Sequence, residues 1–217
     1  MFEINFPSKS IFTPSISLKL HNSSISRELR DSILEIVLKE EQNIIDNVPP
    51  SDPNDKNWMT GRLWNYNFLD LDYDSVRELK NYIKSQYVDF MNQLGYEPEK
   101  VYIQCWVNII RNDGRSIVPH HHADGHSSTK DAPQDYSYLS GNLCIQTENT
   151  STWFRNPFLD KMCAPIQNID GELILFPSFV VHWTDKNLSD KPRVTISFDL
   201  ITEEFYNIVD GKNYREL

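Results

Sequence analysis

Cysteine is scarce in this chain of 217 residues. Only Cys105, Cys144 and Cys163 are present, the count is odd, and no two of them form a C-x-x-C pair. A disulfide framework needs paired cysteines, usually in a secreted protein. We therefore expect reduced thiols and a cytoplasmic protein.

Basic runs and long apolar segments are also missing. Lys and Arg number 21 against 31 Asp and Glu, the net charge is -10, and the pI is about 5.0. Phosphate backbones repel such a chain, so nucleic acid is disfavoured as a partner. The longest apolar runs, such as 172–181, are too short to span a bilayer, and the first twelve residues lack a secretory-signal pattern. We expect no membrane association.

The composition that remains is typical of a packed protein. Hydrophobic residues make up 39% of the chain and aromatic residues 12%, with no repeat or low-complexity tract. A chain of this length suits one domain with a sizeable core. We predict a single domain over residues 1–217, and the sequence leaves its oligomeric state open.

Two helices are predicted in the N-terminal half. Apolar residues recur at helical spacing over 26–42 and again over 75–94. Ser75 and Glu78 have the spacing of a capping box, and Gly95 suits the C-terminal stop.

After Gly95 the apolar pattern changes from helical to extended. Segments rich in β-branched and aromatic residues alternate with turn signals, and the first residues of the chain also alternate. Many short strands after two helices predict an antiparallel sandwich or barrel with helices against one face. The predicted extended segments are 1–22, 101–110, 139–147, 172–183 and 193–201.

The segment 119–126, PHHHADGH, holds four of the six histidines. Within it, His122 and Asp124 stand two residues apart, and alternate residues of a strand point to the same side. His182 follows 58 residues after Asp124, at the end of a β-rich run. Two imidazoles and one carboxylate suit Fe(II) and leave positions open for other ligands. Alone, the stretch is equally compatible with a solvated polar loop.

Arg193 follows His182 by eleven residues, with a turn between them. This spacing brings a guanidinium into the same barrel as the histidines. A buried Arg needs a partner, and a bidentate carboxylate is the natural one. A dicarboxylate could chelate the metal at one end and meet Arg193 at the other, although an isolated Arg at a strand end is usually a surface residue.

With H-x-D, a distal His and an Arg eleven residues after it, the chain resembles the Fe(II)/2-oxoglutarate-dependent oxygenases. More narrowly, it resembles the small bacterial and phage members related to prolyl 4-hydroxylases. The resemblance covers about residues 10–200 and implies a mainly β fold, a double-stranded β-helix (jelly-roll) core buttressed by the two helices. It also implies Fe(II), the cosubstrates 2-oxoglutarate and O2, and ascorbate as an auxiliary reductant, in the cytoplasm of a bacterium or of a phage's host. The matching segments are CWVNI, HHHADGHSS, YLSGNLCI, WFRNP, GELILFPSFVVHW and RVTISFD.

Carried onto this sequence, the resemblance assigns His122, Asp124 and His182 as iron ligands. Several members of the group have H-x-H in place of H-x-D. The alternative register therefore uses His120 and His122 with His182, and no carboxylate. We prefer the register with Asp124, because an anionic ligand suits Fe(II) chemistry.

The resemblance also implies how 2-oxoglutarate is held. Arg193 would take its distal carboxylate, Thr195 would assist through its hydroxyl, and Asn108 would contact the cosubstrate. A Tyr common in the group is replaced here by Cys144, which alters one cosubstrate contact.

The implied reaction is hydroxylation of a substrate C–H bond, as in a peptidyl prolyl 4-hydroxylase. A small-metabolite hydroxylase, a three-histidine cupin-like dioxygenase and a non-catalytic jelly-roll binding protein are the alternatives. Substrate contacts are expected from the loops 46–60 and 127–136, because recognition residues usually lie on loops around a rigid scaffold.

Overall fold

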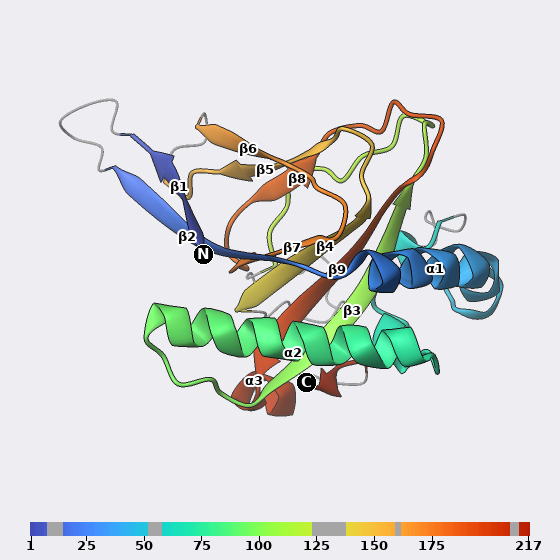
Figure 1. Cartoon of the computed structure of the whole chain (residues 1–217), viewed down its shortest axis with the longest axis horizontal. Helices are drawn as coiled ribbons and strands as arrows, with labels where there is room; N and C mark the ends of the chain where they lie inside the picture. Colours follow the sequence, from blue (N-terminus) through green and yellow to red (C-terminus); the bar gives the residue numbers. More distant parts are fainter. Residues whose placement is uncertain (8–14, 52–57, 123–137, 159–161, 209–212) are drawn as a thin grey trace.

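A computed structural model describes residues 1–7, 15–51, 58–122, 138–158, 162–208 and 213–217. Two antiparallel sheets face one another, and two long helices cover the outer face of the larger sheet (Figure 1). This is the mainly β arrangement with flanking helices that the sequence predicts. The assignment of the whole chain to one domain stays a prediction.

Helix α1 spans Arg27–Asn47, five residues further than predicted at its C-terminal end. Ser26 caps it, because its side chain accepts a hydrogen bond from the backbone N–H of Leu29 at 3.1 Å. The apolar face of α1 is buried against the larger sheet. Its buried residues are Leu29, Ile33, Ile36, Val37 and Ile44.

Helix α2 spans Asp74–Leu94. The predicted capping box is wrong: Tyr73 occupies the N-cap position and makes no side-chain cap, so Ser75 already lies inside the helix. The predicted stop is confirmed, because Gly95 takes the left-handed conformation, with φ of 82°, that glycine adopts without strain.

The larger sheet has seven strands in the order β1-β2-β7-β4-β9-β3-β10, and the smaller has three in the order β6-β5-β8. Strands β5 and β6 were not predicted, and the predicted strand 172–183 is divided between the sheets as β7 and β8. The bounds are β1 Phe2–Phe6, β2 Ile16–Ser24, β3 Val101–Ile110, β4 Leu139–Gln146, β5 Ser151–Arg155, β6 Cys163–Gln167, β7 Glu172–Pro177, β8 His182–Thr184, β9 Arg193–Thr202 and β10 Arg215–Glu216.

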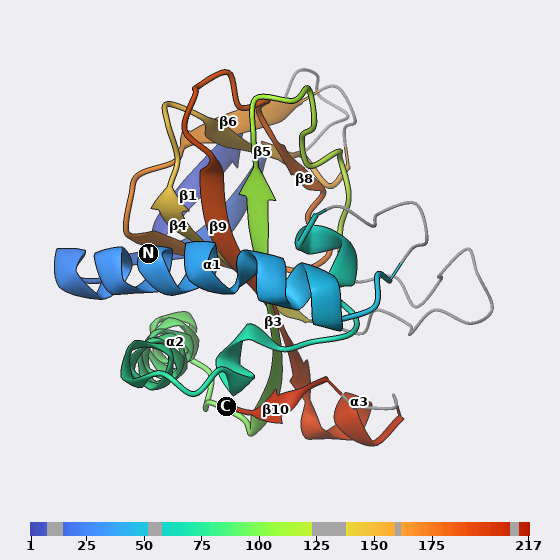
Figure 2. The same cartoon turned by 90° about the vertical axis from the view of Figure 1, so that its right-hand side faces the viewer.

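Short helices complete the described chain: η1 Thr60–Arg62, η2 Phe68–Asp70 and α3 Glu203–Ile208. Buried Arg62 anchors η1, because its guanidinium donates to the backbone carbonyls of Ile45, Val48 and Trp58. The end of α1 and the start of η1 are thereby tied together at one edge of the sheets (Figure 2). No described helix is long and apolar enough to cross a membrane, and all three cysteines are free thiols.

Apolar residues form two clusters, one on each side of the larger sheet. The larger cluster joins α1 and α2 to the helix-facing residues of β3, β4, β7 and β9. The smaller lies between the sheets and includes Leu20, Phe154, Ile174 and Phe176. The space between the sheets that this cluster leaves unfilled holds the candidate site.

The close contact between β4 and β9 generates a stability prediction. A Cβ added at Gly141 would overlap the buried ring of Phe198. We expect Gly141→Ala to lower the free energy of unfolding by about 1–3 kcal/mol, measured by denaturant titration. Adding Phe198→Leu should recover part of that loss, because the smaller side chain leaves room for the methyl group. If Phe198→Leu and Gly141→Ala have strictly additive effects, the proposed contact is not what excludes a side chain at this position.

Candidate metal and anion site

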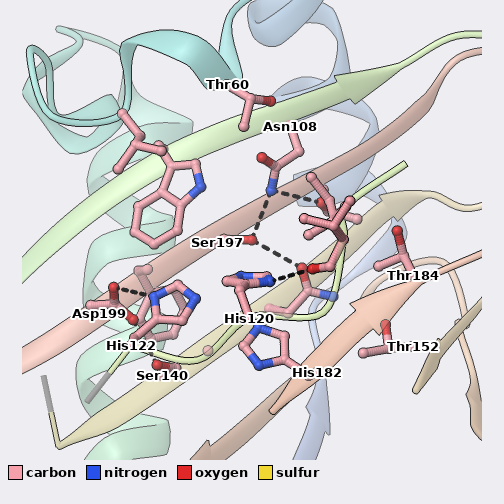
Figure 3. A pocket seen from close by; sticks show the side chains of 18 of the residues that line it. Thr60, Asn108, His120, His122, Ser140, Thr152, His182, Thr184, Ser197 and Asp199 are labelled. Carbon is pink, nitrogen blue, oxygen red and sulfur yellow. Dashed lines mark hydrogen bonds and ion pairs between the residues drawn. The ribbon is translucent and has the colours of Figure 1, made fainter. Parts of the chain in front are cut away.

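A cavity of about 280 Å³ opens between the two sheets (Figure 3). Polar side chains from β3, β4, β8 and β9 line its inner part. The segments 58–64 and 116–118 contribute its apolar wall. Part of the loop 46–60 that was expected to contact substrate therefore does border the cavity, through Trp58 and Thr60. The loop 127–136 lies outside the described residues.

Strand β9 supplies one stripe of the lining. Alternate residues of a strand face the same side, and Arg193, Thr195, Ser197 and Asp199 all border the cavity. The intervening residues include Val194 and Ile196, which belong to the core beneath the helices. Strand β9 thus carries the guanidinium of Arg193 at one end of the cavity lining and the carboxylate of Asp199 six residues further along.

Three histidines come together beside this stripe. His120, His122 and His182 each offer a ring nitrogen, and these three atoms lie within 4.8 Å of one another. The backbones of His120 and His182 pair in both directions, with N–H to O distances of 3.1 and 2.9 Å. The N–H of His122 donates to the carbonyl of Ser178 at 2.9 Å. Backbone pairing therefore fixes the cluster.

The hydrogen bonds of the rings determine which nitrogen faces the cluster. Nδ1 of His120 lies 2.8 Å from the carbonyl of Val118, and Nδ1 of His182 lies 3.0 Å from that of Val180. A carbonyl oxygen only accepts, so in both rings Nδ1 is the donor. In the neutral imidazole, Nε2 then carries the lone pair that binds a metal.

Nδ1 of His122 lies 2.6 Å from a carboxylate oxygen of Asp199. The other carboxylate oxygen accepts from the hydroxyl of Ser140 at 2.6 Å, and Ser140 in turn contacts Ser178 at 2.9 Å. An ionised carboxylate only accepts, so His122 also donates through Nδ1 and has its lone pair on Nε2. Figure 3 shows this contact below the stripe of β9.

Burial keeps two of these rings neutral. Desolvation, and then the proximity of His122, lower the pKa of His120 to about 4. Desolvation and the two neighbouring histidines hold the pKa of His182 well below its ordinary value. Neutral imidazole is the form that ligates a metal, so both rings are ready to bind near pH 7.

Arg193 is the most unusual residue of the cavity. It is 1% exposed, and neither its Nε nor its terminal nitrogens make a hydrogen bond to any described residue. Its burial lowers the pKa of the guanidinium. Because an unpaired buried charge is costly, this arrangement calls for an anionic ligand.

Asn108 and Thr195 lie directly opposite one another in the β3–β9 ladder, and Thr195 is two residues from Arg193 on the same face of β9. The amide of Asn108 donates to Thr195 at 3.4 Å and to Ser197 at 2.9 Å. Its carbonyl oxygen is buried with no donor among the described residues. These groups add polar partners at the Arg193 end of the cavity.

The predicted site residues are therefore brought to one cavity with one exception. His122, His182, Arg193, Thr195 and Asn108 all border it, and His120 joins them. Asp124 lies outside the described residues, so its predicted role stays a prediction.

Sequence reasoning missed Asp199 and Ser140. The alternation along RVTISFD, counted from Arg193, was the signal that could have found Asp199. Trp183, the neighbour of His182 in the sequence, does not line the cavity and stacks on Trp153 instead, with ring centroids 6.0 Å apart.

The donor set fits a divalent metal such as Fe(II). Three imidazoles present Nε2 lone pairs, and a buried carboxylate holds one of the rings, as in many carboxylate–histidine–metal arrangements. The unpartnered Arg193 fits a carboxylate ligand in the same cavity.

Comparison with known proteins agrees with this chemistry. The family model described as "Putative 2OG-Fe(II) oxygenase" matches residues 104–199, which confirms the predicted resemblance. A search of curated proteins finds no match.

Several solved structures share the fold. A prolyl hydroxylase from Trichoplax adhaerens, in complex with a hypoxia-inducible-factor peptide, is 14% identical with a TM-score of 0.60, over 88% of this chain and 86% of that one. A prolyl-4-hydroxylase from Pseudomonas putida is 10% identical with a TM-score of 0.57, over 86% and 89%. The epimerase SnoN, in complex with Fe3+ and α-ketoglutarate, is 12% identical with a TM-score of 0.54, over 85% and 79%. These likenesses confirm the jelly-roll core.

The two neutral histidines generate a pH prediction. In the unfolded chain they titrate near 6.5, above their folded pKa values. The unfolded state therefore binds protons first on acidification. Stability should be full above about pH 6.5 and should fall as the pH decreases toward 4. Denaturant titration of the metal-free protein across this range measures the loss, and His120→Asn should reduce it. Parallel stability profiles for the variant and the wild type would show that His120 contributes nothing to it.

Proposed function

We propose that this chain is an Fe(II)- and 2-oxoglutarate-dependent dioxygenase that hydroxylates a substrate C–H bond, which the match of residues 104–199 to the family model of 2OG-Fe(II) oxygenases supports. The observation that carries the proposal is the buried, unpartnered guanidinium of Arg193 in the same cavity as the histidine cluster. A single dicarboxylate such as 2-oxoglutarate satisfies both features, because one end chelates a metal at the histidines and the other end pairs with Arg193.

The chain's own residues divide between two tasks. Arg193 binds the distal carboxylate of 2-oxoglutarate, and Thr195 and Asn108 supply hydrogen bonds beside it. His122 and His182 hold the metal, with either Asp124 or His120 as the third ligand. When bound, iron and 2-oxoglutarate supply oxidising power from O2, with succinate and CO2 as coproducts and ascorbate as an auxiliary reductant that keeps the iron ferrous. The protein positions these groups and excludes bulk water.

The outer cavity wall supports an apolar substrate group. Trp58, Leu63, Trp64 and Val118 border it, and Trp106 stacks over the ring of His122 with centroids 5.8 Å apart. Aromatic faces of this kind accommodate a saturated ring such as that of proline. Together with the prolyl hydroxylases among the similar structures, this favours a prolyl residue of a peptide as the substrate.

Three alternatives have different requirements. A small apolar metabolite would use the same wall, so only substrate tests separate it from a peptide. A three-histidine dioxygenase without 2-oxoglutarate, or a non-catalytic jelly roll, would leave the charge of Arg193 without a ligand. Arg193 therefore favours the 2-oxoglutarate-dependent reaction. A cytoplasmic location, which the three free thiols support, is part of the same proposal.

Substitution of Arg193 tests the cosubstrate site. Arg193→Met should lower the affinity for 2-oxoglutarate about 30-fold or more, since truncating one partner of a buried charge pair costs about 2–5 kcal/mol. The melting temperature of the ligand-free variant should stay equal or rise, because an unpaired buried charge has been removed. Calorimetric titration and thermal unfolding measure the two quantities. Arg77→Met is the control, since Arg77 lies on α2 and pairs with Asp72 and Asp74 at the surface. Unchanged affinity in Arg193→Met would contradict the assignment.

Succinate formation tests the substrate class. With Fe(II), 2-oxoglutarate and ascorbate, a proline-containing peptide should accelerate succinate release and gain one oxygen atom, which mass spectrometry detects. The same peptide with alanine in place of proline is the control. Succinate release that neither peptide changes would exclude these peptides as substrates and favour a small metabolite.

A further inference from the structure

We propose that Asn108 binds the backbone of a peptide substrate, and that its side-chain carbonyl oxygen accepts a hydrogen bond from a peptide N–H. This N–H belongs to a residue adjacent to the proline that enters the cavity. The inference rests on the proposed function, because it specifies how the proposed peptide substrate is bound. It makes Asn108 a specificity-determining residue.

The side chain of Asn108 is buried in the cavity lining, where it is 5% exposed. Its carbonyl oxygen accepts no hydrogen bond from any residue that the structure describes. Thr60 of η1 also lines this cavity, but its hydroxyl donates to the backbone carbonyl of Val107 at 3.5 Å. A buried acceptor without a donor is unfavourable and rare in folded proteins. The carbonyl oxygen of Asn108 is therefore available to a ligand.

The hydroxyl groups next to Asn108 determine which end of its amide is left without a partner. The amide nitrogen donates to Ser197 at 2.9 Å and to Thr195 at 3.4 Å. The hydroxyl of Ser197 has one hydrogen, which it donates to the carbonyl oxygen of Asn142 at 3.2 Å. Ser197 can therefore only accept from Asn108, so the amide nitrogen must face it. Figure 3 shows the nitrogen on the side of Ser197 and the oxygen on the side of Thr60.

The cosubstrate cannot supply the donor that this oxygen lacks. An ionised dicarboxylate such as 2-oxoglutarate only accepts hydrogen bonds, and both hydrogens of the Asn108 amide already have acceptors. Asn108 thus assists the cosubstrate through Thr195, whose hydroxyl accepts from Asn108 and keeps its own hydrogen for a carboxylate. The carbonyl oxygen of Asn108 is left for a second molecule that carries a donor, which is the substrate.

The charges of the cavity favour a neutral donor. Asp199 is the acidic residue of the described lining, and its two carboxylate oxygens are bonded to His122 and Ser140. Arg193 adds a positive charge to the same lining. A cationic group, such as the charged nitrogen of free proline, would therefore lack a counter-charge at Asn108. A peptide N–H is neutral and suits an amide carbonyl oxygen.

Asn108 lies next to the apolar part of the cavity. Trp106 precedes it by two residues on β3, and both side chains line the cavity. The ring of Trp106 stacks on that of His122, within the histidine cluster. A proline ring packed against Trp106 therefore brings its neighbouring backbone close to Asn108. Proline within a chain has no N–H, so the donor must come from an adjacent residue.

Ester analogues of a peptide test the inference on the wild-type protein. The probes are capped peptides with a central proline and varied flanking residues, each with two analogues in which one flanking N–H is replaced by an ester oxygen. Calorimetric titration without O2, in the presence of Fe(II) and 2-oxoglutarate, measures binding without turnover. One of the two analogues should bind about 5–30-fold more weakly than the parent peptide, because it lacks the donor. Equal binding of all three would overturn the inference.

Asn108→Ala tests whether this loss depends on Asn108. The variant should bind the parent peptide about 5–30-fold more weakly and should no longer distinguish it from the ester analogue. Asn22→Ala is the matched control, because Asn22 is exposed on β2, where its amide donates to Glu172. This control should keep the wild-type preference for the parent peptide. A merely structural role for Asn108 would weaken both peptides equally, which contradicts the inference. If Asn108→Ala does not fold, the ester comparison on the wild type still decides.

Failure of this inference can be distinguished from failure of the proposed function. Peptides that bind equally well as amide and ester, to a protein that converts 2-oxoglutarate to succinate, would overturn the role of Asn108 while the function stands. A preference for the amide that depends on Asn108, in a protein that does not bind 2-oxoglutarate, would support the inference and contradict the function. A wild-type protein that binds none of the peptides would overturn the inference.

Discussion

Strand β9 pairs with β3 on one side and with β4 on the other, and the site depends on the register of these two ladders. The register places Arg193 and Asp199 on the cavity side, with Val194 and Ile196 on the side of the helices. A slip of one residue would exchange the two faces and force both charged groups into the apolar core. The buried face of β9 thereby keeps the site on the cavity side, because a slip by an odd number of residues would bring polar side chains into the apolar core.

This arrangement carries an energetic cost at both ends of the stripe. Asp199 offsets its burial with hydrogen bonds to His122 and Ser140. Arg193 has no such partner among the described residues, so the fold holds a charge whose desolvation only a ligand can offset. The core beneath α1 and α2 supplies the stability that tolerates this cost. One face of β9 lines the cavity and the other packs in the core. The cavity can therefore be polar without weakening the core.

Much of the fold could be predicted because its signals are local. The helical spacing over 26–42, the stop at Gly95 and the extended pattern of β3 and β9 each lie within a few residues of the structure that they determine. The division of 172–183 between two sheets was missed, because the apolar run continues across the bend. Ser75 was misjudged as a cap, because the helix begins one residue earlier and the spacing of a capping box occurs inside helices too.

Only the part of the candidate site that depends on residue spacing could be predicted from the sequence. His122, His182 and Arg193 followed from alternation and chain order. His120 and His182 lie side by side because of a single backbone bridge between segments that are distant in the sequence. No local sequence pattern encodes such a bridge. The contact between His122 and Asp199 joins residues 77 apart in the sequence, and it emerges only when β9 is placed in the sheet.

The central claim is that one molecule of 2-oxoglutarate spans the distance between the metal and Arg193. The most direct test is anaerobic calorimetric titration of 2-oxoglutarate, and of succinate, into the metal-free and the Fe(II)-loaded protein. Succinate has the same distal carboxylate but lacks the keto group that chelates a metal. The account predicts that Fe(II) strengthens the binding of 2-oxoglutarate far more than that of succinate. Equal binding of 2-oxoglutarate with and without Fe(II) would contradict it.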